Sequence, residues 1–473
     1  MQINQQFSNF ILTNKKPEVK TTVTTAQQAP TQTATITKTT PPQYHAGILP
    51  NIDNTIALAQ NTINILLKDD CPKVRSATID IMNNADAFEQ VENVRPFILD
   101  KDDDVRASAL EMVCNAKKPQ DEGLLDLMLN DKADIVKHRA LAIVEKEKRT
   151  DKLERLKSLA INDEKTRFHS LSVIGVIGKP EDVEFLKIGL NDKDLWTRRE
   201  TIKSIAKLGG AKTAEIIKPL IKDKDIWVKT QALVELIKMG NTEYIEEVKT
   251  MAKSKDETER SNATQIIGEV GKTEYVDIIK PLLTDRKKYV KYRAIDAIGE
   301  IANPNLIELV KPSLKDEDAD TRYSAVNAIG KMAKAGKPEY IELIKPLIND
   351  EDKNVKSNIV YAIENIEKPE NLYLLKPLLK EKDDWSRLSI ARAVKEFGKP
   401  EHIELIKPLL NDKADNVRQY AVDAIGKIGK PEHIELIKPL LNDEAYEVKA
   451  EAAVAILRIK KNAENPIPAV QKK

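Results

Sequence analysis

The sequence predicts an all-α protein: a right-handed α-solenoid of about thirteen two-helix repeats, preceded by a disordered N-terminal arm. Three observations carry this prediction. A repeat of about 31 residues runs through most of the chain, each repeat holds two apolar stripes of helical period, and glycine and proline recur at fixed places between them. Of the 473 residues, 41% are hydrophobic but only 4% aromatic, so aliphatic side chains must build the core.

The first fifty residues differ in composition from the rest of the chain. Half of the segment Thr21–Thr40 is threonine, most of the remainder is glutamine, alanine and proline, and Pro41 and Pro42 follow. Such a stretch has too little apolar surface to offset the conformational entropy of folding. We therefore divide the chain into a disordered segment 1–50, a repeat solenoid 51–461 and a short disordered tail 462–473.

The repeat is most visible near the C-terminus. Gly398–Asp412 and Gly429–Asp443 have identical sequences, 31 residues apart, and Gly336–Asp350 differs from them at two positions. One hairpin of this length cannot bury both of its apolar stripes, but stacked copies can, with a contour of roughly 100–130 Å for thirteen layers. We call the residue that closes this segment the anchor; Ser254 holds the place once, and the other twelve are acidic: Asp69, Asp100, Asp131, Asp163, Asp192, Asp223, Asp285, Asp316, Asp350, Glu381, Asp412 and Asp443.

Glycine and proline mark the helix ends within each repeat. The residues expected to end the second helix in the left-handed conformation are Gly178, Gly209, Gly240, Gly271, Gly398 and Gly429. A first set of prolines suits the first helical position, namely Pro180, Pro338, Pro369, Pro400 and Pro431. A second set lies inside the first helix, where proline removes a backbone hydrogen bond and should bend it: Pro96, Pro219, Pro281, Pro312, Pro346, Pro377, Pro408 and Pro439. In the last repeat, Lys460 replaces the terminating glycine, which suggests a polar end cap.

A basic residue occupies the same place in the first turn of every second helix. This place can serve as a basic groove for an acidic partner, but the matching row of anchors favours a structural ladder that ties each turn to its neighbours. The basic members of this ladder are Arg75, Arg106, Lys137, Arg167, Arg198, Lys229, Arg260, Lys291, Arg322, Lys356, Arg387, Arg418 and Lys449.

The candidate binding residues are aromatic side chains and histidines. Trp196, Trp227, Tyr289 and Trp385 share one register, four residues after the anchor, and Trp196 and Trp227 should be neighbours in space. They either anchor a ligand or cap the apolar layer where the helix begins. His138 and His169 fall on adjacent second helices and are the best polar candidates for a site. The remaining histidines are His45, His402 and His433, of which the last two suit a half-exposed helix position.

The second helix of the repeat resembles a known family. Val417, Arg418, Ala421, Ala424, Ile425, Gly426, Ile428 and Gly429 follow the pattern of the HEAT repeat, in particular the short variant of phycobilisome-lyase-type proteins. The resemblance covers about 410 residues and implies the solenoid fold. It leaves function open, because the family includes scaffolds, bilin lyases and an iron hydroxylase. That hydroxylase type, deoxyhypusine hydroxylase, binds iron through His-Glu dipeptides, and none of the five histidines here is followed by glutamate.

The expected function is a non-catalytic protein-interaction scaffold that binds a partner on the concave face, lined by the second helices. Near-identical repeats favour this reading, because a catalytic site needs unique residues at one place. The alternatives are a bilin lyase-like or hydroxylase-like enzyme and a nucleic-acid-binding protein. The balance of 76 basic and 75 acidic residues disfavours nucleic acid. The sequence indicates no cofactor, no metal site and no membrane span, and we expect a cytoplasmic protein with two reduced cysteines.

Overall fold

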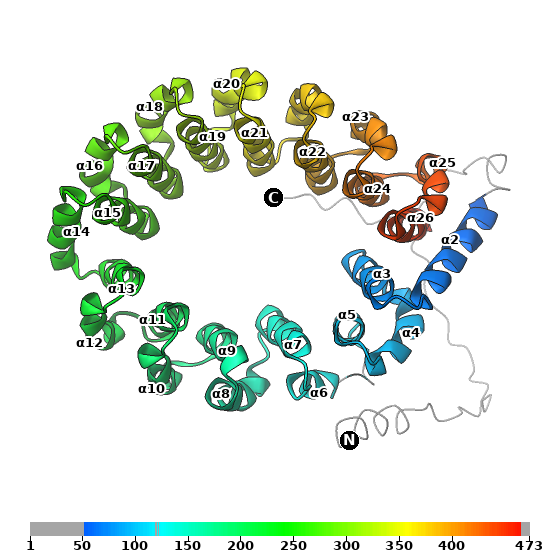
Figure 1. Cartoon of the computed structure of the whole chain (residues 1–473), viewed down its shortest axis with the longest axis horizontal. Helices are drawn as coiled ribbons and strands as arrows, with labels where there is room; N and C mark the ends of the chain where they lie inside the picture. The colour runs from blue at the N-terminus through cyan, green and yellow to red at the C-terminus, as the bar shows by residue number, and fades with distance from the viewer. Residues whose placement is uncertain (1–51, 119–120, 122, 465–473) are drawn as a thin grey trace, which may run out of the picture.

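The computed structural model describes residues 52–118, 121 and 123–464, and over these residues the chain is a stack of thirteen helical hairpins. The predicted all-α solenoid is confirmed. The stack curves until its two ends meet, so that the molecule is a closed ring with an open centre (Figure 1). The predicted arm 1–50 lies outside the described residues. So does most of the predicted tail, although the last helix continues through Glu464.

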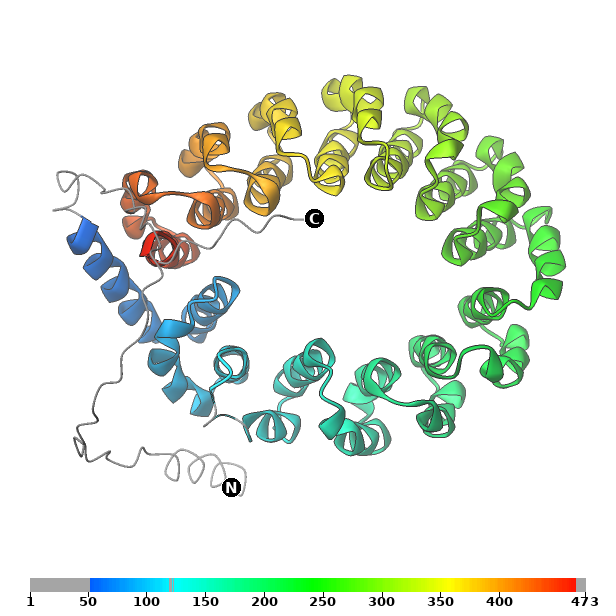
Figure 2. The same cartoon turned by 180° about the vertical axis from the view of Figure 1, so that it is seen from behind.

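Each hairpin places its first helix on the outside of the ring and its second helix on the inside (Figures 1 and 2). The outer helices are α2 (Ile52–Leu67), α4 (Val91–Val94), α6 (Leu124–Leu129), α8 (Leu153–Asn162), α10 (Val183–Leu186), α12 (Ala214–Ile217), α14 (Ile245–Ala252), α16 (Val276–Ile279), α18 (Ile307–Val310), α20 (Ile341–Ile344), the 3-10 helix η16 (Pro369–Lys380), α23 (Ile403–Ile406) and α25 (Ile434–Ile437). The inner helices are α3 (Pro72–Asn84), α5 (Asp103–Asn115), α7 (Asp134–Glu147), α9 (Glu164–Ile177), α11 (Leu195–Gly209), α13 (Ile226–Lys238), α15 (Glu257–Val270), α17 (Lys288–Ile301), α19 (Ala319–Lys334), α21 (Lys353–Ile366), α22 (Asp384–Phe397), α24 (Asp415–Ile428) and α26 (Tyr446–Glu464).

The prolines shape the outer helices, although differently from the prediction. Proline inside the outer helix does not leave a bent α-helix: a four-residue α-helix such as α23 is followed by a 3-10 segment, Lys407–Asn411, that contains Pro408 at its start. The ring of proline clashes with the carbonyl four residues earlier, and the tighter 3-10 turn replaces the lost α-helical bond. Of the outer helices without an interior proline, α8 and α14 stay α-helical, whereas α10 is followed by a 3-10 segment, Lys187–Asn191, as in the hairpins with proline. The first set of prolines lies at the start of short 3-10 turns, as predicted.

The glycines that end the inner helices fall into two groups, and the prediction is right for one of them. Gly240 and Gly271 have positive φ angles of 96° and 72°. Gly178, Gly398 and Gly429 are instead extended, with φ near −70°, and after Gly209 it is Gly210 that takes the positive φ, 56°. Glycine is still needed at the extended positions, because a Cβ there would lie 2.3–2.6 Å from the carbonyl oxygen four residues earlier.

A second row of glycines draws the inner helices together. A Cβ on Gly299 would lie 2.7 Å from the Cα of Ala328 on the next inner helix, and Gly426 faces Ala455 in the same way. Gly268 and Gly330 repeat this contact with alanine. Such small residues let the helix backbones approach closely on the inside, while Leu, Ile and Val separate the layers farther out. Each hairpin is therefore a wedge, and the stack curves toward its inner helices.

The ring closes where the last inner helix meets the first hairpin, and we call this junction the seam. α26 packs along both α2 and α3, although α3 ends at Asn84 and α26 begins only at Tyr446. The prediction of a polar end cap is wrong for this reason: Ala450, Val454 and Leu457 on α26 are each at most 7% exposed, and exposed residues return only in its last turn. In its described part the chain has no helix long and apolar enough to cross a membrane.

Candidate functional site

The basic and acidic residues of the ladder form one row of ion pairs along the edge of the ring where inner helices begin. Arg387 donates from Nε and Nη2 to both carboxylate oxygens of Asp412, the anchor of the next hairpin, at 2.6 and 2.8 Å. Its Nη1 donates to the carbonyl oxygen of its own anchor, Glu381, at 2.7 Å. One guanidinium thus ties its own turn to the following one. The same interhairpin pairing joins Arg75–Asp100, Arg106–Asp131, Lys137–Asp163, Arg167–Asp192, Arg198–Asp223, Arg260–Asp285, Lys291–Asp316, Arg322–Asp350, Lys356–Glu381 and Arg418–Asp443.

The ladder pairs are shielded from water, which makes them stronger than ordinary surface pairs. The Arg387 and Asp412 side chains are only 6% and 9% exposed. Burial alone would raise the pKa of Asp412, but hydrogen bonds from Arg387 and from the Ala414 N–H outweigh burial and hold its pKa below the ordinary 3.8. Since both partners stay charged and the Arg387 guanidinium is engaged by Asp412 and Glu381, this pair fixes the stack of hairpins.

Two junctions between neighbouring hairpins lack the regular ladder ion pair. Where Ser254 replaces the acidic anchor, Lys229 instead pairs with Glu247 on α14 at 2.7 Å. At the seam, the ladder pattern would pair Lys449 with Asp69, but in the described part of the chain Lys449 forms no ion pair. Asp69 accepts a hydrogen bond from the Cys71 N–H in its own turn.

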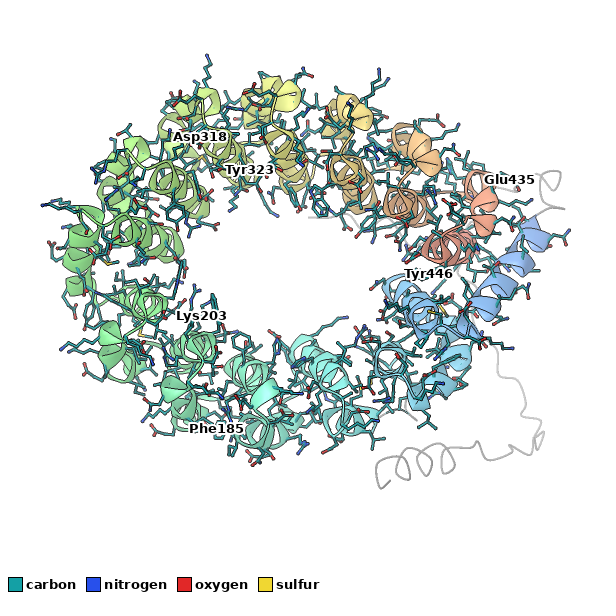
Figure 3. All side chains as sticks on the ribbon, in the orientation of Figure 1. Phe185, Lys203, Asp318, Tyr323, Glu435 and Tyr446 are labelled. Atoms are coloured by element: carbon teal, nitrogen blue, oxygen red, sulfur yellow. The ribbon has the colours of Figure 1, made fainter. Side chains whose placement is uncertain are left out.

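The inner wall of the ring carries side chains that differ from one hairpin to the next. Its positions are the first, fifth and ninth residues after each ladder residue, except where these are buried, as Thr230 and Val234 on α13 are. Lys203 and Tyr323 at such positions point toward the open centre (Figure 3). These three positions hold Arg199, Lys203 and Lys207 on α11; Tyr323, Asn327 and Lys331 on α19; Gln419, Asp423 and Lys427 on α24. The wall therefore presents a distinct chemical surface at each hairpin, in contrast to the repeated ladder.

The predicted aromatic residues lie at the start of inner helices and contact the inner wall. Trp196, Trp385 and Tyr289 are 53%, 48% and 42% exposed, whereas Trp227 is half-buried. Arg199 lies 5.7 Å over the Trp196 ring, and Tyr289 packs edge-to-face on Tyr292 at 5.5 Å. Trp196 and Trp227 occupy the same place on the adjacent helices α11 and α13, and among the described side chains no ring contact joins them. Sequence reasoning missed Tyr323, which is exposed. Tyr323 directly follows its ladder residue, as Tyr292 does, whereas the predicted aromatic residues lie two residues before theirs.

The two candidate histidines do meet. The rings of His138 and His169 lie edge-to-face at 4.7 Å, and Phe168 packs on His169 at 5.3 Å. Burial and the neighbouring His138 lower the pKa of His169, so His169 favours the neutral state. His138 Nε2 lies 3.3 Å from the Lys165 carbonyl oxygen. No set of three or more His, Cys, Asp or Glu side chains in residues 52–118, 121 and 123–464 is arranged to hold a metal ion.

His402 departs from its expected half-exposed position. It is buried, 3% exposed, because the Tyr373 ring lies 4.9 Å away, and its Nδ1 accepts a hydrogen bond from the Lys399 N–H. His433 is half-exposed, as predicted, and accepts the equivalent bond from the Lys430 N–H. Both imidazoles thus complete the turn that starts an outer helix, which is a structural role.

Polar networks along the inner wall cross two or three hairpins, and sequence reasoning missed them. Arg139 reaches Asp80, two hairpins away, at 2.9 Å and Glu111 at 2.5 Å. Arg392 donates to both oxygens of Glu364 at 3.0 and 3.1 Å and lies 4.6 Å over the Tyr361 ring. Asp80, Glu111 and Arg392 share one register, five residues after the ladder residue, but their partners Arg139 and Glu364 lie outside it.

The two cysteines offer little nucleophilic chemistry. Cys114 is deeply placed, and burial raises the pKa of its thiol to about 12, so that the reactive thiolate is disfavoured. Cys71 is free and exposed near the seam.

The geometry on the inner wall, with exposed aromatic rings and positioned charges on rigid helices, suits binding.

The chain has distant likenesses among solved structures. No curated protein matches the chain. Among solved structures, an engineered protein shares 18% identity, with 86% of this chain and 99% of that chain covered, at a TM-score of 0.32. YibA from Escherichia coli shares 15% identity (54% and 96% covered, TM-score 0.39), and human deoxyhypusine hydroxylase shares 14% (53% and 97% covered, TM-score 0.25). Likenesses at this level say nothing about activity or partners.

A sequence profile of the family gives the assignment. The profile of HEAT repeats matches residues 183–268, 276–342, 307–395 and 383–458, which together make up more than half of the chain. The matched part contains nine of the inner helices, from α11 to α26, and with them most of the ladder. The chain therefore belongs to the HEAT-repeat family.

Proposed function

We propose that this protein is a non-catalytic scaffold that holds a protein partner against the inner wall of its ring. The observation that supports this most directly is the contrast between the ladder and the inner wall. Eleven of the thirteen ladder positions make the same interhairpin pair among the described residues, while the combination of side chains at the inner-wall positions differs from one hairpin to the next. A repeated part suits architecture, and a varied part suits recognition of an irregular surface.

Exposed aromatic rings are the expected anchors for the partner. Trp196, Tyr323 and Trp385 are 53%, 38% and 48% exposed on otherwise buried helices. Large aromatic side chains dominate the binding energy of protein interfaces, and tryptophan, tyrosine and arginine lead among them. Arg199 and Arg392 lie over the Trp196 and Trp385 rings and hold them in place. A partner can therefore bury pre-positioned rings with little loss of side-chain entropy.

The rings are spread over α11, α19 and α22, so binding should be shared among several hairpins. Truncation of one such ring at an interface commonly costs about 1–2 kcal/mol, roughly a five- to thirtyfold loss of affinity, and distant sites add. Single substitutions should therefore weaken capture, and combined ones should abolish it. Since these side chains are exposed, the substitutions should leave folding intact.

Site-specific photocrosslinking tests the proposal. p-Benzoylphenylalanine is placed at Tyr323 on the inner wall and, as the matched control, at Tyr373, an outer-helix tyrosine that is 50% exposed. After irradiation of cells that express each variant, position 323 should yield a discrete crosslinked protein and position 373 should not. The combined variant Trp196→Ala, Tyr323→Ala, Trp385→Ala should lose that protein in affinity capture.

Other outcomes would replace the proposal. Crosslinks from position 373 alone would place the partner on the outside of the ring. A defined activity abolished by His138→Ala or His169→Ala alone would indicate an enzyme. Capture of nucleic acid, with affinity that falls steeply as salt is raised, would indicate a nucleic-acid-binding protein.

A further inference from the structure

We propose that the seam is a reversible end-to-end interface, and that two copies of this chain can join by exchanging their ends across it. In the single ring, α26 covers α2 and α3 of the same chain; in the joined form, it covers α2 and α3 of a second copy. This inference does not depend on the proposed function, because it concerns only contacts within the ring.

The seam differs from the other junctions in its connection. Every other pair of neighbouring inner helices is joined through one outer helix, whereas residues bonded across the seam, such as Asp86 and Lys461, lie 375 positions apart in the chain. Opening the seam therefore requires no change within any hairpin. It exposes two apolar surfaces, one on α26 and one on α2–α3, that are complementary to each other.

The contacts that close the seam are weaker than a ladder rung. Arg458 donates to the carbonyl oxygens of Ala85 and Asn84, each at 3.3 Å. Lys461 pairs with Glu89 at 2.9 Å, but these side chains are 48% and 42% exposed, and water screens such a pair. Beside the seam lies a solvent-open cavity of about 430 Å³, lined by Asn84, Val454 and Arg458 and, from α22 and α24, by Lys395, Glu396 and Lys427. The polar contacts of the seam are thus exposed, and its buried part is apolar, with Ala450 and Val454 on α26 at most 1% exposed.

The occupant that fits the opened seam is a second copy of this chain. Every copy carries both halves of the interface, which makes it heterologous: the surface on α26 matches the surface on α2–α3, and neither matches itself. The two halves are close within one ring, so dilute protein closes on itself. At high protein concentration the same halves meet between chains, as in domain swapping, and form a dimer or a longer head-to-tail chain.

A pair of engineered cysteines distinguishes closure within a chain from closure between chains. In a background with Cys71→Ser and Cys114→Ser, the seam pair is Glu89→Cys with Lys461→Cys. The control pair is Lys291→Cys with Asp316→Cys, a ladder rung inside the stack whose charged groups lie 2.7 Å apart. Each protein is unfolded, refolded at low and at high concentration, separated by size, and treated with a short bismaleimide.

The refolded monomer should crosslink within the chain for both pairs. In the larger species formed at high concentration, the seam pair should link two chains, so that most of the protein doubles its mass on a denaturing gel. The control pair should stay within one chain in every fraction, because exchange of ends leaves interior junctions intact. The proposal is overturned if the seam crosslink stays within one chain in the larger species, or if no larger species forms at high concentration.

Discussion

The junction between α22 and α24 and the seam between α26 and α3 join inner helices of the same ring, yet they are held in different ways. The first has a buried bidentate pair, Arg387–Asp412, and two further ion pairs, Lys395–Asp423 and Lys427–Glu396. The second has long hydrogen bonds to carbonyl groups and one exposed pair. The ladder ion pairs depend on residues that recur from repeat to repeat. The seam joins two unlike ends of the chain and lacks the equivalent pair among its described residues.

The largest expected effect on stability comes from the removal of one ladder ion pair. Arg387→Ala leaves the Asp412 carboxylate buried without its partner, which should destabilise that junction by about 3–5 kcal/mol. Because repeat arrays unfold in parts, we expect the loss as faster amide hydrogen exchange in α22 and α24. The double variant Arg387→Met, Asp412→Leu should recover most of the protection; if it does not, the charge itself is required.

The next effect comes from the packing of the seam. Ile63 on α2 is 1% exposed, and Ile63→Ala should cost about 2–5 kcal/mol through the cavity that it leaves. Hydrogen exchange should rise in α2, α3 and α26 and stay unchanged in α15 and α17 across the ring. Exposed Ile65→Ala, at 60% exposure, is the matched control. A rise that spreads around the ring would show that the seam does not open independently.

A third effect concerns pH. Burial raises the pKa of Glu451 on α26 from 4.5 to about 8; nearby Asp423 adds to this, while Arg458, Gln419 and Lys395 oppose it. The folded protein thus keeps a proton that the unfolded chain releases, so the free energy of unfolding should fall as pH rises from about 4.5 to 8 and level off above. Glu451→Gln should flatten this part of the curve in urea titrations. Glu464→Gln, at a 61% exposed carboxylate on the same helix, should not.

The smallest effect is expected at the exposed pair. Lys461→Ala should change the stability of the seam by no more than about 1 kcal/mol, because its pair with Glu89 is half exposed. The same hydrogen-exchange measurement on α26 checks it. A loss as large as that of Arg387→Ala would mean that the seam is fastened as firmly as a ladder junction.

Local features of the fold could be predicted from the sequence, and features that accumulate along the stack could not. The hairpins follow from apolar stripes of helical period within a single repeat. Ring closure depends on the small rotation between neighbouring hairpins, summed over the whole stack. The size of that rotation cannot be read from the sequence of a single repeat. One signal was present: Ala450 and Val454 on α26 stand where α24 carries Gln419 and Asp423, and such apolar residues on an inner wall require a covering surface.

The candidate site was predictable to a similar degree. The register of Trp196, Tyr289 and Trp385 placed exposed rings correctly at the start of inner helices. Tyr323 was missed because it belongs to another position of the same helix face. Contacts such as Arg139 with Asp80 span 59 residues, and only the curvature of the stack brings those side chains together.

Closure turns the number of hairpins into a constrained quantity. An open solenoid tolerates the gain or loss of one repeat, because the array only becomes longer or shorter. Here α26 must arrive at α2 and α3, so a duplication or deletion of 31 residues changes the angle that every remaining wedge has to cover. Such a length variant must either strain all of its interfaces a little or leave its two ends apart. Selection on the number of repeats should therefore be stricter for this chain than for solenoids with free ends.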